Sequence, residues 1–248
     1  MRVDVYFGPQ EVSAADVANR AVAVVDVLRA STSIVVALAN GARAVIPMAS
    51  SEDVVSRSKT LARSEVKLAG ERKMQPIAGF DMGNSPLEFT KEAVDGKTII
   101  MSTTNGTSAV LAVQGARDVI IASYVNFSAA LSMLRAALRG GTDVAIVCAG
   151  QDKRFALEDA ACAGLFVQRI TEKHTKAEIN DAAQAALLID KKFGANLKRL
   201  VRSSAHGVAL EEAGFGADLA VCAALDSYSV LPVFQDRQIT KLGTERAR

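Results

Sequence analysis

A short apolar stretch at residues 98–101 ends abruptly in six small hydrogen-bonding residues, 102–107, with the sequence Ser-Thr-Thr-Asn-Gly-Thr. A helix-like apolar pattern follows over residues 106–114. This order predicts a strand that runs into a helix N-terminus, where unpaired N–H groups, hydroxyls and the positive end of the helix dipole can bind phosphate. An ordinary helix cap is the alternative interpretation. The predicted phosphate contacts are Thr103, Thr104, Asn105, Gly106 and Thr107.

A second apolar strand, predicted at residues 21–27, carries a carboxylate near its end. A buried carboxylate without a partner is costly, so Asp26 should be paired or should bind a metal. Arg29, three residues later, could be that partner. We favour Asp26 as a metal ligand or general acid–base and Arg29 as a phosphate ligand, because a guanidinium fork matches phosphate oxygens.

These two segments resemble one another. Aligning Gly-Ala-Arg at 41–43 with Gly-Ala-Arg at 115–117 gives two units of the same order: strand, hydroxyl-rich turn, short buried helix, glycine, strand. The pattern predicts an internal repeat, which arises either from duplication or from the order of elements that α/β folds commonly share. In either case both turns would lie at strand carboxyl ends, where open α/β sheets bind ligands.

Further carboxylates follow two other predicted strands. Glu158 and Asp159 lie in the first turn of a helix predicted at 155–173, where they either complement the helix dipole or bind a hard cation. Glu71 begins a long irregular segment, 70–86, of the kind that is usually functional. With Asp26, these three residues form the predicted Mg²⁺ ligand set.

Three further residues, Cys148, Arg154 and His206, suggest alternatives or additions to this chemistry. Cys148 and Arg154 have the Cys-x5-Arg spacing of cysteine-dependent phosphatases, but Val147 and Phe155 replace the usual neighbours, so a buried strand-end thiol is the favoured interpretation. His206 either caps a helix or donates a proton to a leaving oxygen, and we include it with Asp26 and Arg29 among the predicted catalytic residues.

Composition indicates a folded protein with a sizeable core. Of 248 residues, 50% are apolar, and the net charge of +2 gives no reason to expect nucleic-acid binding. No apolar run is long enough to span a membrane and the N-terminus lacks a signal-peptide pattern, so we expect a cytoplasmic protein, with a homo-oligomer left open. The odd number of widely spaced cysteines, three, is typical of reduced thiols.

Alternating strand and helix patterns predict a three-layer α/β/α fold with a mostly parallel sheet, in a single domain over residues 1–248. An additional strand is expected near 220–223, and Asp218 is expected to be a surface charge. The predicted strands are 2–7, 21–27, 43–47, 66–69, 98–102, 117–122 and 143–148. The predicted helices are 12–18, 31–40, 51–63, 86–93, 106–114, 126–138, 155–173, 179–190, 194–202 and 204–213.

Six motifs occur in a fixed order along the chain: Asp-Val-Leu-Arg-Ala-Ser-Thr from residue 26, Ala-Asn-Gly-Ala from 39, Gly-Glu-Arg from 70, Gly-Phe-Asp-Met-Gly-Asn-Ser-Pro from 79, the 102–107 turn, and Cys-Ala-Gly followed by Leu-Glu-Asp over 148–159. Together they resemble the 2-phosphosulfolactate phosphatase family of coenzyme M biosynthesis, over about residues 20–230. One departure is visible: Lys73-Met74 follows Gly-Glu-Arg where a glycine-rich sequence is expected.

The resemblance implies an Mg²⁺-dependent phosphatase that hydrolyses (2R)-2-phospho-3-sulfolactate to 3-sulfolactate and phosphate. Such a substrate carries a carboxylate and a sulfonate besides its phosphate. Arg72, Lys73, Arg154 and His206 are the candidate donors for those groups, and we predict Arg72 and Arg154 because planar donors match their oxygens. Two alternatives remain at this point: a cysteine-dependent phosphatase using Cys148 and Arg154, and a phosphate- or anion-binding protein without catalysis.

Overall fold

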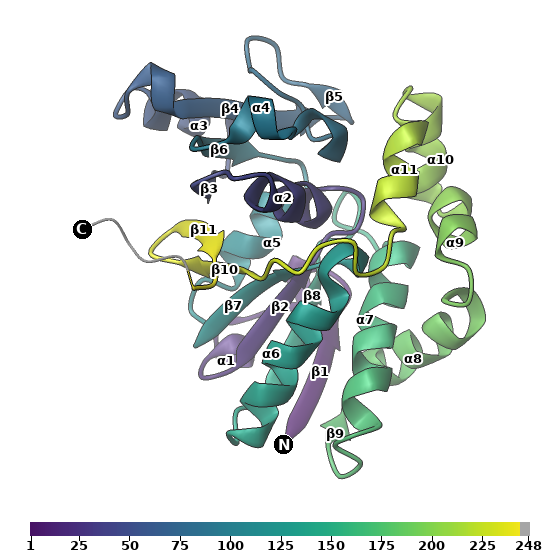
Figure 1. Cartoon of the computed structure of the whole chain (residues 1–248). Coiled ribbons are helices and arrows are strands. Elements are labelled where there is room, and N and C mark those ends of the chain that lie inside the picture. Colours follow the sequence, from purple (N-terminus) through teal and green to yellow (C-terminus); the bar gives the residue numbers. More distant parts are fainter. Residues whose placement is uncertain (244–248) are drawn as a thin grey trace.

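The computed structural model describes residues 1–243. In these residues eleven strands form one sheet in the order β5-β4-β6-β3-β11-β10-β7-β2-β8-β1-β9 (Figure 1). The strands are β1 (Arg2–Tyr6), β2 (Ala21–Val25), β3 (Ala44–Pro47), β4 (Val66–Arg72), β5 (Gln75–Pro76), β6 (Thr98–Ser102), β7 (Asp118–Ala122), β8 (Val144–Cys148), β9 (Glu178–Ile179), β10 (Pro232–Gln235) and β11 (Gln238–Lys241). Strands β4-β6-β3 and β7-β2-β8-β1-β9 pair in parallel, so the predicted mostly parallel sheet is confirmed.

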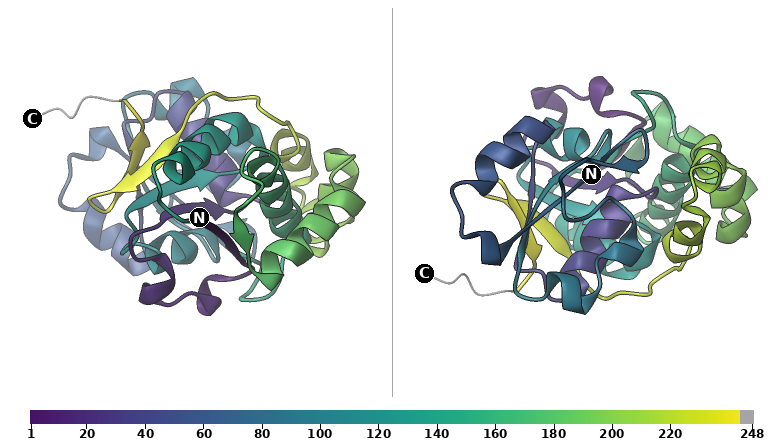
Figure 2. Two further views of the ribbon diagram at one scale, coloured as in Figure 1. Left: turned by 90° about the horizontal axis from the view of Figure 1, so that it is seen from below. Right: turned by 90° about the horizontal axis from the view of Figure 1, so that it is seen from above.

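Helices flank this sheet on both faces, which confirms the predicted layered α/β architecture (Figures 1 and 2). The α-helices are α1 (Ala14–Val17), α2 (Ala30–Ala39), α3 (Ser51–Ser58), α4 (Lys91–Val94), α5 (Gly106–Ala112), α6 (Phe127–Arg139), α7 (Leu157–Thr171), α8 (Asp181–Phe193), α9 (Leu197–Ser203), α10 (Ala205–Glu212) and α11 (Gly216–Cys222). Short 3₁₀ turns are η1 (Pro9–Glu11), η2 (Arg63–Glu65), η3 (Pro86–Glu88) and η4 (Tyr124–Asn126).

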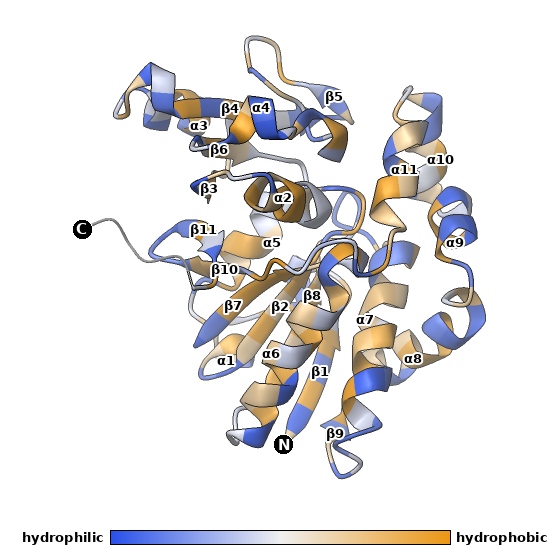
Figure 3. Ribbon diagram, viewed as in Figure 1, coloured by the Kyte–Doolittle hydropathy of each residue, from blue (hydrophilic) through white to orange (hydrophobic). Residues whose placement is uncertain are grey.

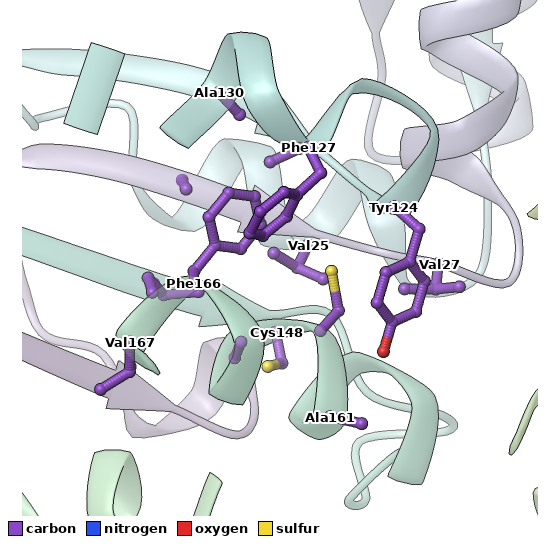
Figure 4. Close-up of a cluster of buried hydrophobic side chains, with 14 of the residues drawn as sticks. Val25, Val27, Tyr124, Phe127, Ala130, Cys148, Ala161, Phe166 and Val167 are labelled. Carbon is purple, nitrogen blue, oxygen red and sulfur yellow. The ribbon is translucent and has the colours of Figure 1, made fainter. Parts of the chain in front are cut away.

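Strand β2 explains why the sheet is covered twice. Its alternate residues Ala21, Ala23 and Val25 pack into the core beneath α6 and α7, whereas Val22 and Val24 pack into the opposite core beneath α2 and α5. A strand buried on both faces must be apolar at every position, which is the pattern of its sequence. Figure 3 shows the same apolar colouring along β2, β7 and β8, and Figure 4 shows the core on the α6–α7 side.

The two units of the predicted repeat cross between the halves of the sheet. In one unit β2 leads through α2 to β3, and in the other β6 leads through α5 to β7. Strand β2 pairs with β7 and β3 pairs with β6, so each unit contributes one strand to each half. The antiparallel hairpin β10–β11 joins the halves, which turn relative to one another in Figure 1. This crossing brings the starts of α2 and α5 together.

Two predictions about elements are wrong, and one hairpin was missed. Residues 220–223 belong largely to α11 rather than to a strand, because a short apolar run of this kind does not distinguish the two. The β10–β11 hairpin was not predicted; it is short and turns through Asp236 and Arg237, both at positive φ, without the usual glycine. The helix expected over 86–93 is divided into η3 and α4. Assignment of residues 1–248 to a single domain stays a prediction.

No helix within residues 1–243 combines the length and apolar character that crossing a lipid bilayer requires.

Candidate active site

A cavity of about 380 Å³ lies where β2, β4, β6 and β8 end. Seven of the predicted site residues line it: Asp26, Arg29, Glu71, Thr103, Thr104, Asn105 and His206. Other lining residues include Lys73, Met74, Asn84, Gln151 and Asp152. The crossing of the two units thus brings together turns that are separated by more than seventy residues in the chain.

Asp26 follows β2 and is buried beside the start of α2. The Ala30 amide donates to its Oδ1 at 3.1 Å. Burial raises the pKa of Asp26 to about 6; nearby His206 and the Ala30 amide oppose the shift, and the charges of Glu71 and Glu158 add to it. Asp26 is therefore a carboxylate whose protonation changes near neutral pH.

Gly106, at the start of α5, allows a close approach of the two turns. A Cβ atom on Gly106 would lie 2.4 Å from the Ala30 Cβ and 2.5 Å from the Asp26 Oδ2. These distances are shorter than non-bonded contacts allow. Gly106 was predicted as a phosphate contact, but it does not line the cavity. Its lack of a side chain leaves the space that Asp26 and α2 occupy.

Arg29 pairs with a carboxylate other than Asp26. Its Nη1 lies 2.7 Å from the Oδ2 of Asp218, and both side chains are only 2% exposed. Its Nη2 donates to the Met74 carbonyl at 3.1 Å, and its guanidinium lies 4.4 Å from the centre of the Phe215 ring. The expectation that Asp218 is a surface charge was wrong: the Ser85 hydroxyl also donates to it, at 2.6 Å.

His206 and Glu158 form a buried pair, of which only His206 lines the cavity. The His206 Nδ1 lies 3.2 Å from the Glu158 Oε1. Burial alone would lower the pKa of His206, but the hydrogen bond to Glu158 and the charges of Glu158 and Asp26 outweigh it, so the pKa is raised. The second carboxylate oxygen of Glu158, Oε2, is buried and has no protein partner within residues 1–243.

Two of the predicted metal ligands have both carboxylate oxygens engaged by backbone amides. Asp159 accepts hydrogen bonds from Val27 at 2.8 Å and Gly150 at 3.1 Å, and so ties the β2 and β8 turns together. Glu71 accepts from Thr104 at 2.7 Å and Met74 at 2.8 Å, and so ties the β6 turn to the β4–β5 turn. Both carboxylates hold the walls of the cavity in place.

The Thr-rich turn is more self-contained than its sequence suggested. The Thr103 amide donates to the Thr107 hydroxyl at 3.2 Å, and the Thr107 amide donates to the Thr103 hydroxyl at 3.1 Å. Thr107 therefore stabilises the turn and, unlike Thr103, does not line the cavity. Asn105 does, with its Oδ1 accepting from the Asp152 amide at 3.0 Å.

The structure does not bring Arg72 or Arg154 into the cavity. Successive residues of a strand point to opposite faces, so Glu71 lines the cavity while Arg72 hydrogen-bonds the hydroxyl of Ser102 at 2.8 Å. Arg154 is exposed, and its backbone closes a turn with Gln151. Lys73, at the tip of the β4–β5 turn, lies where these two cations were expected.

Asn84 is a cavity residue that the sequence did not reveal. Ser85, the next residue, caps η3 by accepting a hydrogen bond from the Leu87 amide. Asn84 is left facing the cavity, and its Oδ1 is buried without a protein partner within residues 1–243. A buried amide oxygen without a partner indicates a place where a ligand or water can donate.

Cys148 does not have the environment of a nucleophile. It is only 1% exposed and packs among apolar side chains such as Val25 and Phe166 (Figure 4). Burial raises its pKa well above the usual value, which keeps the thiol protonated. With Arg154 on the surface, the Cys-x5-Arg segment does not assemble a phosphate-binding loop.

Comparison with known proteins gives one consistent result. The family model described as 2-phosphosulpholactate phosphatase matches residues 6–237. A probable 2-phosphosulfolactate phosphatase of Symbiobacterium thermophilum is 39% identical over 229 residues, which cover 92% of this chain and 97% of that protein. Proteins of the same name from Thermotoga petrophila and Clostridium beijerinckii are 42% identical over 168 residues and 36% identical over 179 residues, covering 68% and 72% of this chain and 68% and 74% of their own lengths. The chain therefore belongs to the 2-phosphosulfolactate phosphatase family.

Proposed function

We propose that this protein is a phosphatase that hydrolyses 2-phospho-3-sulfolactate to 3-sulfolactate and phosphate. One observation carries the proposal: His206, which is paired with Glu158, lines the same cavity as the Asp26 carboxylate and the 103–105 turn. The names of the relatives support the choice of substrate. A cytoplasmic location, expected from the sequence, is part of the same proposal.

The phosphoryl group would lie against the β6 turn and Arg29. The Thr103 and Thr104 amides already donate hydrogen bonds, so the donors left for phosphate are the hydroxyls of Thr103 and Thr104 and the amides of Asn105. Arg29 adds a guanidinium that Asp218 holds in place. A charge held by a buried partner needs little reorganisation when the transition state forms.

Mg²⁺ would be held chiefly by Asp26 and Glu158. Within residues 1–243 no group of three or more His, Cys, Asp and Glu side chains is arranged to hold a metal ion. Mg²⁺ in phosphoryl-transfer sites usually takes one or two carboxylates and completes its shell with water and substrate oxygens. The unpartnered Oε2 of Glu158 and the hard carboxylate of Asp26 fit that requirement. When bound, the ion would neutralise charge on the transferring phosphoryl group.

His206 would supply the proton for the leaving oxygen. The bond to Glu158 favours the imidazolium form, and His206 lines the cavity, so it can donate to a substrate there. Glu158 orients the ring through Nδ1 and leaves Nε2 for the substrate.

The alternative of anion binding without catalysis fits the cavity less well. A protein that only bound phosphate would gain nothing from carboxylates at the anion, because like charges oppose binding. Here Glu71 accepts a hydrogen bond directly from the Thr104 amide at 2.7 Å, and Asp26 lines the same cavity. Carboxylates this close to the β6 turn favour chemistry over simple binding.

The decisive assay measures phosphate release from 2-phospho-3-sulfolactate and other phosphorylated hydroxy acids, with EDTA and then with added Mg²⁺. We expect activity to disappear in EDTA and return with Mg²⁺, and Cys148→Ser to remain active. Full activity in EDTA together with an inactive Cys148→Ser would instead favour the cysteine route. No release from any ester under either condition would refute the phosphatase proposal.

A further inference from the structure

The turn between β4 and β5 places a lysine at the cavity. Lys73 and Met74 adopt φ values of 50° and 69°, in the left-handed region that favours glycine or asparagine. The turn is nevertheless fixed: the Met74 amide donates to Glu71 at 2.8 Å, and its carbonyl accepts from Arg29 at 3.1 Å. The backbone of Lys73 is therefore held in place by the hydrogen bonds of this turn, although its side chain is exposed.

The charge of Lys73 is not neutralised as those of the other cavity cations are. Arg29 is paired with Asp218, and His206 with Glu158. No hydrogen bond or ion pair of the Lys73 ammonium occurs within residues 1–243, although it lines the cavity. An unpaired ammonium beside a phosphate site is suited to a second anion.

We infer that Lys73 is a specificity-determining residue that binds a second anionic group of the substrate, a carboxylate or a sulfonate, while the phosphate lies against the 103–105 turn. The inference rests on the proposed phosphatase function. Lys73 would discriminate esters that carry a second anionic group from simple phosphate esters. Lys73 replaces Arg72 and Arg154 in this role, because neither of them reaches the cavity.

The test uses three esters: 2-phospho-3-sulfolactate, 2-phospholactate and p-nitrophenyl phosphate. Lys73→Gly removes the ammonium and suits the positive φ, so the fold should be retained. We expect its KM to rise about 10- to 100-fold on esters that carry the second anion, with kcat within about threefold and p-nitrophenyl phosphate unaffected. Lys73→Arg should keep most of the affinity.

The matched control is Lys153→Gly. Lys153 also lies at positive φ, at 60°, in a turn beside the cavity, but it does not line the cavity. This variant should behave as the wild type on all three esters, which separates the loss of charge from the relaxation of a turn.

The outcomes distinguish the inference from the proposed function. A Lys73→Gly loss on both 2-phospho acids assigns the ammonium to the carboxylate, and a loss on the sulfonated ester alone assigns it to the sulfonate. An equal loss on all three esters, or none, overturns the inference. If the wild type hydrolyses no ester, the proposed function fails, and calorimetric affinities of wild type and Lys73→Gly for the same esters still test Lys73.

Discussion

The β2–α2 turn and the β6–α5 turn share one skeleton but differ in their chemistry. The first buries two ionisable groups, Asp26 and Arg29. The charges of distant residues affect the pKa of Asp26, and Arg29 forms an ion pair with a distant carboxylate. The second contains uncharged Thr103 and Thr107, which bond each other across a single turn. The charged side chains of the first turn therefore depend on the tertiary structure, whereas the Thr103–Thr107 pair of the second is satisfied locally.

In this comparison the charged turn supplies an ionisable group, whereas the neutral turn supplies a fixed backbone. Desolvating Asp26 is costly, and the cost appears as a raised pKa near the cavity. The neutral turn carries no such cost and can hold a fixed backbone against the substrate. Gly106 keeps the two turns in contact.

Asp26→Asn should have the largest effect. Loss of the carboxylate should lower kcat by about 10²- to 10⁴-fold, as expected when a group central to charge neutralisation or proton transfer is removed. Asp118→Asn, on the amino end of β7, is the matched control and should keep normal turnover. Wild-type turnover by Asp26→Asn at saturating Mg²⁺ would show that Asp26 has no catalytic task.

The same substitution should stabilise the metal-free fold. The folded-state pKa of Asp26, about 6, lies above its ordinary value of 3.8, so stability should decrease as pH rises from about 4 to 6 and stay low above that range. At pH 8 in EDTA, the free energy of unfolding of Asp26→Asn should therefore exceed that of the wild type by about 2–3 kcal/mol. Denaturant titrations at pH 4 and pH 8 measure this, and an equal difference at both pH values would contradict it.

His206→Gln should lower kcat by about 10²-fold, since a general acid contributes 10²- to 10⁴-fold. Because Glu158 helps raise the pKa of His206, the wild-type kcat should fall as pH rises above that pKa. In Glu158→Gln this alkaline limb should move to lower pH. A limb that does not move would mean that another group supplies the proton.

Gly106→Ala tests the contact between the two turns. A Cβ at this position would overlap Ala30 and Asp26, so the turns must separate, at a cost of about 1–3 kcal/mol in unfolding free energy. Activity should fall about 10- to 100-fold, since small misplacements of reacting groups have effects of this size. Gly115→Ala, where no atom lies within 4 Å of the added Cβ, should change neither property. Similar behaviour of the two variants would refute the role of Gly106.

Thr107→Val should have the smallest effect on activity. It removes the acceptor of the buried Thr103 amide and should cost about 1–3 kcal/mol of stability. Since Thr107 does not line the cavity, kcat should change by no more than about fivefold. A loss as large as that of Asp26→Asn would mean that the neutral turn takes part in the chemistry.

The sequence by itself determined the elements whose signals are local. Continuous apolar runs predicted β2, β6, β7 and β8, because strands buried on both faces need apolar side chains at every position. The order strand, polar turn, helix placed the site at strand ends. It also identified most of the residues that line the cavity, including Asp26, Thr103 and His206.

The tertiary structure alone decided the partners of those residues. Arg29 pairs with Asp218, 189 positions away, and His206 with Glu158, 48 positions away, because α10 and α11 return to the carboxyl ends of the strands. The choice of Lys73 over Arg72 likewise depends on which face of β4 each side chain takes and on how the following turn bends. Local residue spacing predicts helices, strands and caps, because these depend on neighbours in the chain. Contacts between distant segments depend on how the two crossing units pack, and this packing cannot be read from a local pattern.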